Sequence, residues 1–367
     1  MPFSLNKRRG TISGIIFVAT VASGATYISQ LSFVSALGLS PLVIGIVIGI
    51  FYANTLHNHF PPSWESGIIF SAKKILRFAI VVYGFRITFQ QIAEVGLHGF
   101  LVSLIMLSST MLIGIWLGTK VFKMDRDTSI LTASGASVCG AAAVLATEPV
   151  LKADEYKTAV AVSMVVLFGT ISMFLYPVLY TTIIEPSSDF LHMDPQTFGI
   201  YVGGTIHEVA QVVAVPASIP NTPPEMANSA VIVKMTRVLL IAPMLIILGV
   251  VLSLIQNTHS KNGKKIHIVI PWFAVYFVIV AGINSLILYY LNTSLQPYAS
   301  SIKSTIDNIN TIDTFLLTMA MTALGMGTQF SKFKNVGMAP LYTAIAMFVW
   351  LVAGGFVIIK VIGALVA

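Results

Sequence analysis

Long, nearly continuous runs of apolar residues recur along the whole chain, and they constrain the fold more than any other feature. Each run approaches the roughly 20 residues that a helix needs to cross a bilayer. Of the 367 residues, 56% are hydrophobic and 10% are charged, whereas soluble globular chains carry about 25% charged residues. A transmembrane β-barrel would show short alternating segments instead. We therefore expect an all-α polytopic membrane protein.

The apolar runs predict about 10–11 transmembrane helices in one integral membrane domain, residues 1–367. Their approximate limits are residues 13–31, 41–54, 75–92, 100–122, 128–151, 158–184, 198–215, 227–255, 268–291, 311–330 and 340–362. The first apolar run follows a KRR motif, and the two together also fit a cleaved signal peptide. We expect this run to be retained as a transmembrane span, because many further apolar runs follow it. It would be additional to two repeat halves, about 40–184 and 197–365.

Basic residues in the loops give an orientation. They form clusters near residues 7–9, 73–77, 120–126, 261–265 and 332–334. If the N-terminus is cytoplasmic and every run crosses, all of these clusters lie inside, as the positive-inside rule requires. Residues 185–195 would lie inside too, yet they include Glu185, Asp189 and Asp194 and no lysine or arginine.

Two short apolar runs resemble each other. The sequence SGASVCGAAAVLAT (134–147) aligns without gaps with VGGTIHEVAQVVAV (202–215), so that Gly135 matches Gly203 and Ser137 matches Thr205. Small and β-branched residues recur in many membrane helices, which is the simpler explanation. The functional explanation is an internal inverted repeat of interrupted helices, as in many secondary transporters.

Two topologies fit this repeat. If both runs are re-entrant, they come from opposite faces and residues 185–195 move outside. If both cross fully, they run parallel and the charge-poor loop stays unexplained. The sequence slightly favours the re-entrant topology.

The glycine-rich runs can form a site for an anion. Glycine leaves helical geometry at little cost, and an interrupted helix exposes unpaired N–H groups that favour negative charge. Ser137 and Thr205 would add hydroxyl donors beside Gly135, Gly140 and Gly203. The alternative is close helix packing through small residues.

Ionisable residues at membrane depth are costly and usually functional. His207 and Gln211 are one turn apart, with Glu208 beside them. A zinc-protease motif would need histidine at 211, so we expect a polar pocket in which His207 and Glu208 carry a coupling proton. An interfacial cluster is the alternative.

Lys234 and Arg237 lie about 7 and 10 residues into their apolar run and share a helix face. They would need counter-charges, for which Glu208, Glu148, Asp313 or an anionic substrate are candidates, unless they extend to the membrane surface. Arg86 raises the same question. Cys139, the only cysteine, is best explained as a small buried residue within the substrate site.

Four segments together resemble the bacterial sulfate exporter family, the YeiH-like membrane proteins: SGASVCGAAAV, VLFGTISMFLYP, GGTIHEVAQVVA and VIVKMTRVLLIAP. The resemblance covers nearly the whole chain. Family members commonly have SICG and HDVAQ where this chain has SVCG and HEVAQ. The resemblance implies a cell inner membrane location and membership of the wider cation:proton antiporter and anion transporter group. It also implies inverted five-helix repeats and an interrupted run 128–151 that crosses the membrane, paired with a second break at residues 322–329.

These observations together predict a secondary active transporter, an exporter of a small anion such as sulfate, sulfite or a sulfonate, coupled to protons. The expected substrate site comprises Gly135, Ser137, Cys139, Gly140, Gly203, Thr205, His207, Gln211, Lys234 and Arg237. A cation/proton antiporter is the first alternative, and a membrane-embedded enzyme that uses Cys139 and His207 or a metal is the second. We expect no enzymatic activity, cofactor, metal or nucleic-acid partner. A homodimer is one assembly that the sequence allows.

Overall fold

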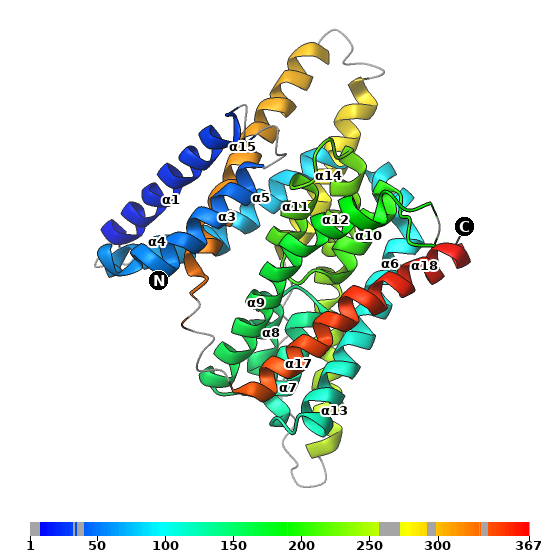
Figure 1. Ribbon diagram of the computed structural model, residues 1–367. Helices are drawn as coiled ribbons and strands as arrows, with labels where there is room; N and C mark the ends of the chain where they lie inside the picture. The colour runs from blue at the N-terminus through cyan, green and yellow to red at the C-terminus, as the bar shows by residue number, and fades with distance from the viewer. Residues whose placement is uncertain are drawn as a thin grey trace. The chain divides into compact units, whose positions relative to one another are not determined.

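The computed structural model describes residues 8–31, 34, 40–188, 190–256, 272–291, 299–329, 331 and 337–366. The basic clusters at 261–265 and 332–334, together with Lys7 and Asp189, lie outside these residues. The described chain contains helices and no strands (Figure 1). The expectation of an all-α polytopic membrane protein is confirmed.

Among the described residues, 7 helices are long and apolar enough to cross a membrane. They are Arg8–Ser29, Phe89–Val121, Glu155–Ile184, Pro224–Leu252, Trp272–Leu291, Ser300–Gly327 and Met338–Leu365. This count is below the 10–11 expected because four of the predicted runs form short or interrupted helices. Predicted runs 128–151 and 198–215 are each divided into two half-helices, and the helix at Pro41–Leu56 is short. The fourth, 75–92, is divided between α5 (Leu76–Tyr83), a 3-10 turn at Gly84–Arg86 and the start of α6 (Phe89–Trp116).

The chain forms two compact units that alternate along the sequence. Unit 1 comprises residues 1–94, 213–228 and 273–331, and unit 2 comprises residues 95–212, 229–272 and 332–367. Each unit is described separately below. The expected repeat halves, about 40–184 and 197–365, stay a prediction.

Unit 1 packs its helices through glycines. It contains α1 (Arg8–Ser29), α3 (Pro41–Phe51), α4 (Glu65–Phe70), α5, α14 (Trp272–Leu291) and α15 (Ala299–Gly327). A Cβ on Gly49 of α3 would overlap the backbone of α15 at Thr322, and one on Gly325 would overlap Ile46 of α3. Gly14 and Gly67 hold α1 and α4 together in the same way. The small residues let the helix backbones touch, as is common in membranes.

Unit 2 is framed by α6, α9 (Glu155–Leu179), α17 (Met338–Val349) and α18 (Gly355–Val366). Helix α6 runs antiparallel to α17 and α18. One end of this frame is marked by the approach of His98 to Gly363. The other end is marked by the ring contact of Phe122 with Tyr342. We call these the His98 end and the Phe122 end of unit 2.

Helices α7 (Arg126–Ser137) and α8 (Ala141–Leu151) form a re-entrant hairpin from the Phe122 end. As one straight helix, residues 126–151 would span about 39 Å. Instead, Lys157, which follows α8 at the start of α9, lies 2.9 Å from the carboxylates of both Asp125 and Asp127 at the start of α7. Leu131 of α7 and Val144 of α8 share one hydrophobic cluster. The chain therefore reverses direction at residues 138–140.

Helices α10 (Pro195–Thr205) and α11 (Val209–Ala217) form a second hairpin, from the His98 end. The residues before α10 lie at that end, where Lys360 of α18 donates to the carbonyl of His192. Helix α12 (Pro224–Leu239) runs alongside α10 in the same direction: Gly203 lies against Ala230, and Lys234, further on, reaches residues 206 and 207. Because α10 and α12 start at the same end, α11 is the returning arm.

The two predicted runs are therefore re-entrant and come from opposite ends of unit 2, the first of the two topologies above. The hairpin formed by α7 and α8 contradicts the fully crossing arrangement of run 128–151. Helix α15 ends at Gly327, inside the second break expected at residues 322–329, and the pairing of that break with run 128–151 stays a prediction. Residues 190–195 lie at the His98 end, opposite the basic residues 120–126 at the Phe122 end. This separation agrees with the lack of lysine and arginine in the loop that the positive-inside rule would ask for on the outer face; the orientation itself stays a prediction.

Candidate binding site at the hairpin tips

Each hairpin tip is a short break between two half-helices. In the first, Val138 leaves helical geometry (φ −117°, ψ −86°) and Gly140 adopts φ +76°, ψ −139°, a region almost restricted to glycine. In the second, Ile206 is extended, with φ −74° and ψ 146°. Each break leaves the last carbonyls of one half-helix and the first N–H groups of the next without helical partners.

Lys234 of α12 connects the two tips. Its side chain is fully buried, and its Nζ donates to the carbonyl of Val138 at 2.8 Å and to those of Ile206 and His207 at 2.6 Å. A buried ammonium is stable only when its donors are satisfied. The negative ends of α7 and α10 supply acceptors for it.

Arg237, one turn further along α12, is fully buried too. Its guanidinium donates to the carbonyl of Ser137 at 2.7 Å and to that of Ala136 at 3.2 Å in the first hairpin. It also donates to the carbonyls of Gly203 and Gly204 in the second. One planar fork thereby caps the C-terminal ends of α7 and α10 together.

The expected extension of Lys234 and Arg237 to the membrane surface is therefore wrong. Main-chain carbonyls of the two hairpin tips accept hydrogen bonds from both side chains. From the sequence, three carboxylates or an anionic substrate were the candidate counter-charges. Interrupted helices provide backbone carbonyls that serve the same purpose.

Glu208 also joins the two tips, but as a hydrogen-bond acceptor at the N-terminal end of a half-helix. Its carboxylate Oε1 accepts the N–H of Ala141, the first residue of α8, at 2.7 Å. A Cβ on Gly140 would overlap this carboxylate, so only glycine allows the contact. Glu208, Ala141 and Ala142 are half-exposed, whereas the neighbouring tip residues 136–140 and 201–207 are buried.

Two buried side chains at the second tip have polar atoms without partners in the described structure. His207 is 2% exposed and Gln211 is 0% exposed; the unpaired atoms are His207 Nδ1 and Gln211 Nε2. Gln211 Oε1 accepts the N–H of Glu208 at 3.2 Å. Because unpaired buried polar atoms are rare, these two mark a place for a ligand or a proton.

The remaining predicted residues have structural contacts. The Ser137 hydroxyl donates to the Ser134 carbonyl, and the Thr205 hydroxyl bonds to Tyr201 and Tyr176. Other contacts hold the arms together: Gly135 lies against Val144 and Val165, Gly203 lies against α12, and Cys139 is a buried free thiol. The structure thus places all ten predicted residues on the two hairpins and α12, at the tips or within about two turns of them.

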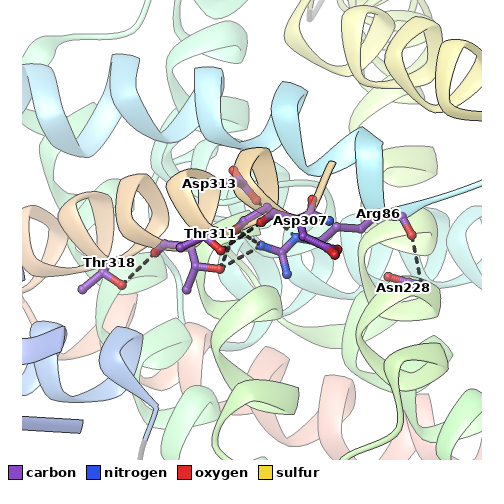
Figure 2. A network of polar contacts seen from close by, with 8 residues as sticks. Arg86, Asn228, Asp307, Thr311, Asp313 and Thr318 are labelled. Atoms are coloured by element: carbon purple, nitrogen blue, oxygen red, sulfur yellow. Dashed lines mark hydrogen bonds and ion pairs between the residues drawn. The ribbon is translucent and has the colours of Figure 1, made fainter. Parts of the chain in front are cut away.

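Unit 1 contains a polar network that sequence reasoning missed (Figure 2). Arg86 Nη2 donates to the Asn310 carbonyl and to Thr314 Oγ1 of α15. Its Nε lies 3.4 Å from the carboxylate of Asp313, which is 0% exposed. The main-chain carbonyl of Arg86 accepts from Asn228 at 3.5 Å. The sequence does show an arginine and an aspartate in separate apolar runs, which could have pointed to this network. Their pairing across more than 200 positions, however, cannot be deduced from one sequence.

The chain matches the model of one protein family, described as conserved hypothetical protein 698, over residues 13–344. It is 44% identical to a UPF0324 membrane protein of Pseudomonas putida, over 95% of this chain and 93% of that protein. It is 43% identical to the UPF0324 inner membrane protein YeiH of Escherichia coli K12, over 97% and 95% of the two chains. A UPF0324 membrane protein of Bacteroides thetaiotaomicron is 43% identical as well, over 95% and 98%. The chain therefore belongs to the UPF0324 family of membrane proteins.

Proposed function

We propose that the protein is a secondary active transporter that exports a small anion, such as sulfate, sulfite or a sulfonate, in exchange with or together with protons. One observation carries the proposal: two oppositely oriented re-entrant hairpins meet at their tips around two buried cations. Inverted interrupted helices that meet at a midplane site are typical of secondary transporters.

The charge at the tips favours an anion. Lys234 and Arg237 contribute two positive charges, and the carboxylate of Glu208 contributes one negative charge. The N-terminal ends of α8 and α11 add positive potential. A ligand could approach through the half-exposed residues Glu208, Ala141 and Ala142. In this proposal the amide Nε2 of Gln211 binds the anion, and His207 and Glu208 carry the coupling proton.

Transport can be tested in proteoliposomes. Uptake of labelled sulfate, sulfite and taurine is measured with and without an imposed pH gradient. We expect flux for at least one anion and a faster rate with the gradient. Gln211→Leu should lower this flux at least tenfold, whereas Gln90→Leu, at an exposed position, should leave it unchanged. Absence of flux for every anion would refute the proposal.

A cation/proton antiporter is the alternative, and the buried carboxylate of Asp313 favours it. In that case Asp313→Asn would abolish cation-driven proton movement in the same vesicles. An anion transporter predicts no response to cation gradients in either protein.

A further inference from the structure

Unit 1 contains a cavity of about 620 Å³. Its walls come from the Tyr83–Gln91 region, the first turn of α12, α14 and the first part of α15. Eight of the fourteen lining residues have polar or charged side chains: Arg86, Thr88, Gln91, Asn228, Asn284, Lys303, Asp307 and Asn310. The volume falls within the range of roughly 300–1,000 Å³ that is typical of small-molecule sites. None of these residues belongs to the hairpin tips.

Arg86 offers a positive group to this cavity. Its Nη2 is held by Asn310 and Thr314, and its Nε faces Asp313. These contacts fix the guanidinium plane, while Nη1 has no partner in the described part of the chain. The side chain is 28% exposed and lines the cavity. A fixed guanidinium with one free nitrogen can donate a charge-assisted hydrogen bond to a carboxylate or a sulfonate.

The same cavity offers acceptors that lack donors. Asn284 donates through Nδ2 to the Ile87 carbonyl at 3.0 Å, but its Oδ1 is buried without a donor in the described structure. Asn310 Oδ1 is buried and unpaired as well. A buried acceptor without a donor costs free energy, so a ligand that brings an N–H or O–H group would recover some of that free energy. An inorganic anion without a proton has no group that could donate to these acceptors.

We propose that this cavity binds a small organic anion, a carboxylate or sulfonate that also carries a hydroxyl or amino group. The anionic group binds Arg86 at Nη1, and the hydroxyl or amino group donates to Asn284 or Asn310. Asp313 keeps the guanidinium in place from behind. The proposal concerns binding alone, and it holds whether or not the hairpin tips transport an anion.

Two matched ligand pairs test the chemistry by calorimetry on the purified full-length protein in detergent. Isethionate is compared with ethanesulfonate, and lactate is compared with propionate. Each pair differs by one hydroxyl group, so we expect five- to tenfold tighter binding of the hydroxylated member, the equivalent of one hydrogen bond of about 1–1.4 kcal/mol. Equal affinities within both pairs would overturn the proposal. Binding of phosphatidylglycerol without binding of any soluble ligand would overturn it too, because the site would then hold lipid.

Variants test the residues. Arg86→Gln should weaken binding at least tenfold, and Arg86→Lys should weaken it less because it keeps the charge but loses the fork. The double variant with Arg86→Gln and Asp313→Asn removes both charges, so it avoids an unpaired buried carboxylate and should bind as weakly as Arg86→Gln alone. Asn284→Leu and Asn310→Leu combined should abolish the preference for the hydroxyl group while keeping anion binding. Arg77→Gln, at an exposed arginine that contacts Phe273, is the control. Wild-type affinity in the double variant would overturn the proposal.

Discussion

Replacing Gly140 by alanine perturbs the junction of the hairpin tips in a way that can be worked out from the structure. The backbone there has φ +76° and ψ −139°, which costs a residue with a Cβ about 1–3 kcal/mol. The new Cβ would also displace the Glu208 carboxylate. That displacement breaks the charge-assisted bond to the N–H of Ala141, worth about 1.5–3 kcal/mol. The expected loss of stability is therefore about 2.5–6 kcal/mol.

The measurement is the midpoint of thermal unfolding in detergent. One kcal/mol lowers the midpoint by about 2–4 °C in chains of 150–250 residues, so Gly140→Ala should lower it by at least about 5 °C. Gly24→Ala is the matched control. Gly24 lies inside α1 with no atom within 4 Å of an added Cβ, so this change should be neutral or stabilising by up to about 1 kcal/mol.

A double-mutant cycle separates the two contributions. Glu208→Ala alone loses the bond to Ala141 but leaves the backbone of Gly140 unstrained. Combined with Gly140→Ala, it should cost no more than Gly140→Ala alone, because the bond is already broken there. The coupling energy should be about 1.5–3 kcal/mol. Strictly additive effects, or a Gly140→Ala protein as stable as the wild type, would refute the reasoning.

Three further predictions concern topology, the buried lysine and a helix cap. With Cys139 replaced, single cysteines at Arg126 and Asp154 should react with an impermeant thiol reagent from the same face of the membrane and one at Ser188 from the other; labelling of Asp154 and Ser188 from one face would contradict the hairpin. Lys234→Met leaves three buried carbonyls without a donor and should destabilise the protein by about 3–5 kcal/mol, seen as a large drop in the thermal midpoint; an unchanged midpoint would show that the carbonyls find other donors. Burial raises the pKa of Asp194, but hydrogen bonds from Thr197 outweigh this and lower the pKa below its ordinary value of 3.8. The stabilisation from the ionised cap is thus fully present above the unfolded pKa and is lost as the pH falls through the folded pKa. The deficit of Asp194→Ala, about 0.5–2 kcal/mol at pH 7, should therefore shrink as the pH falls below the ordinary pKa of 3.8; a deficit independent of pH would contradict this.

Much of the tip site could be predicted from the sequence because the signals are local. Gly135 and Gly203 stood at matching positions in two short apolar runs, and HEVAQ placed ionisable groups beside the second. The charge-poor loop 185–195 indicated that two of the runs do not cross. These signals depend on composition over a few residues, which membrane insertion constrains strongly.

The partners of the charged groups could not be predicted, because they are tertiary. Lys234 and Arg237 were expected to need carboxylates or an anionic substrate as counter-charges. In the structure they bond to main-chain carbonyls, which every residue has and which no sequence motif reveals. The pairing of Arg86 with Asp313 joins the end of α5 to the middle of α15. One sequence shows both residues but not that they meet.

The bonds of α12 to both tips bear on how the hairpins could move. Lys234 and Arg237 each bond to carbonyls of both hairpins, and Glu208 of the second hairpin holds the first residue of α8 in the first. A gate formed by one hairpin alone could open only by breaking several charge-assisted bonds at about 1.5–3 kcal/mol each. The two hairpins and α12 are therefore mechanically coupled, and none of the three can shift alone without breaking these bonds.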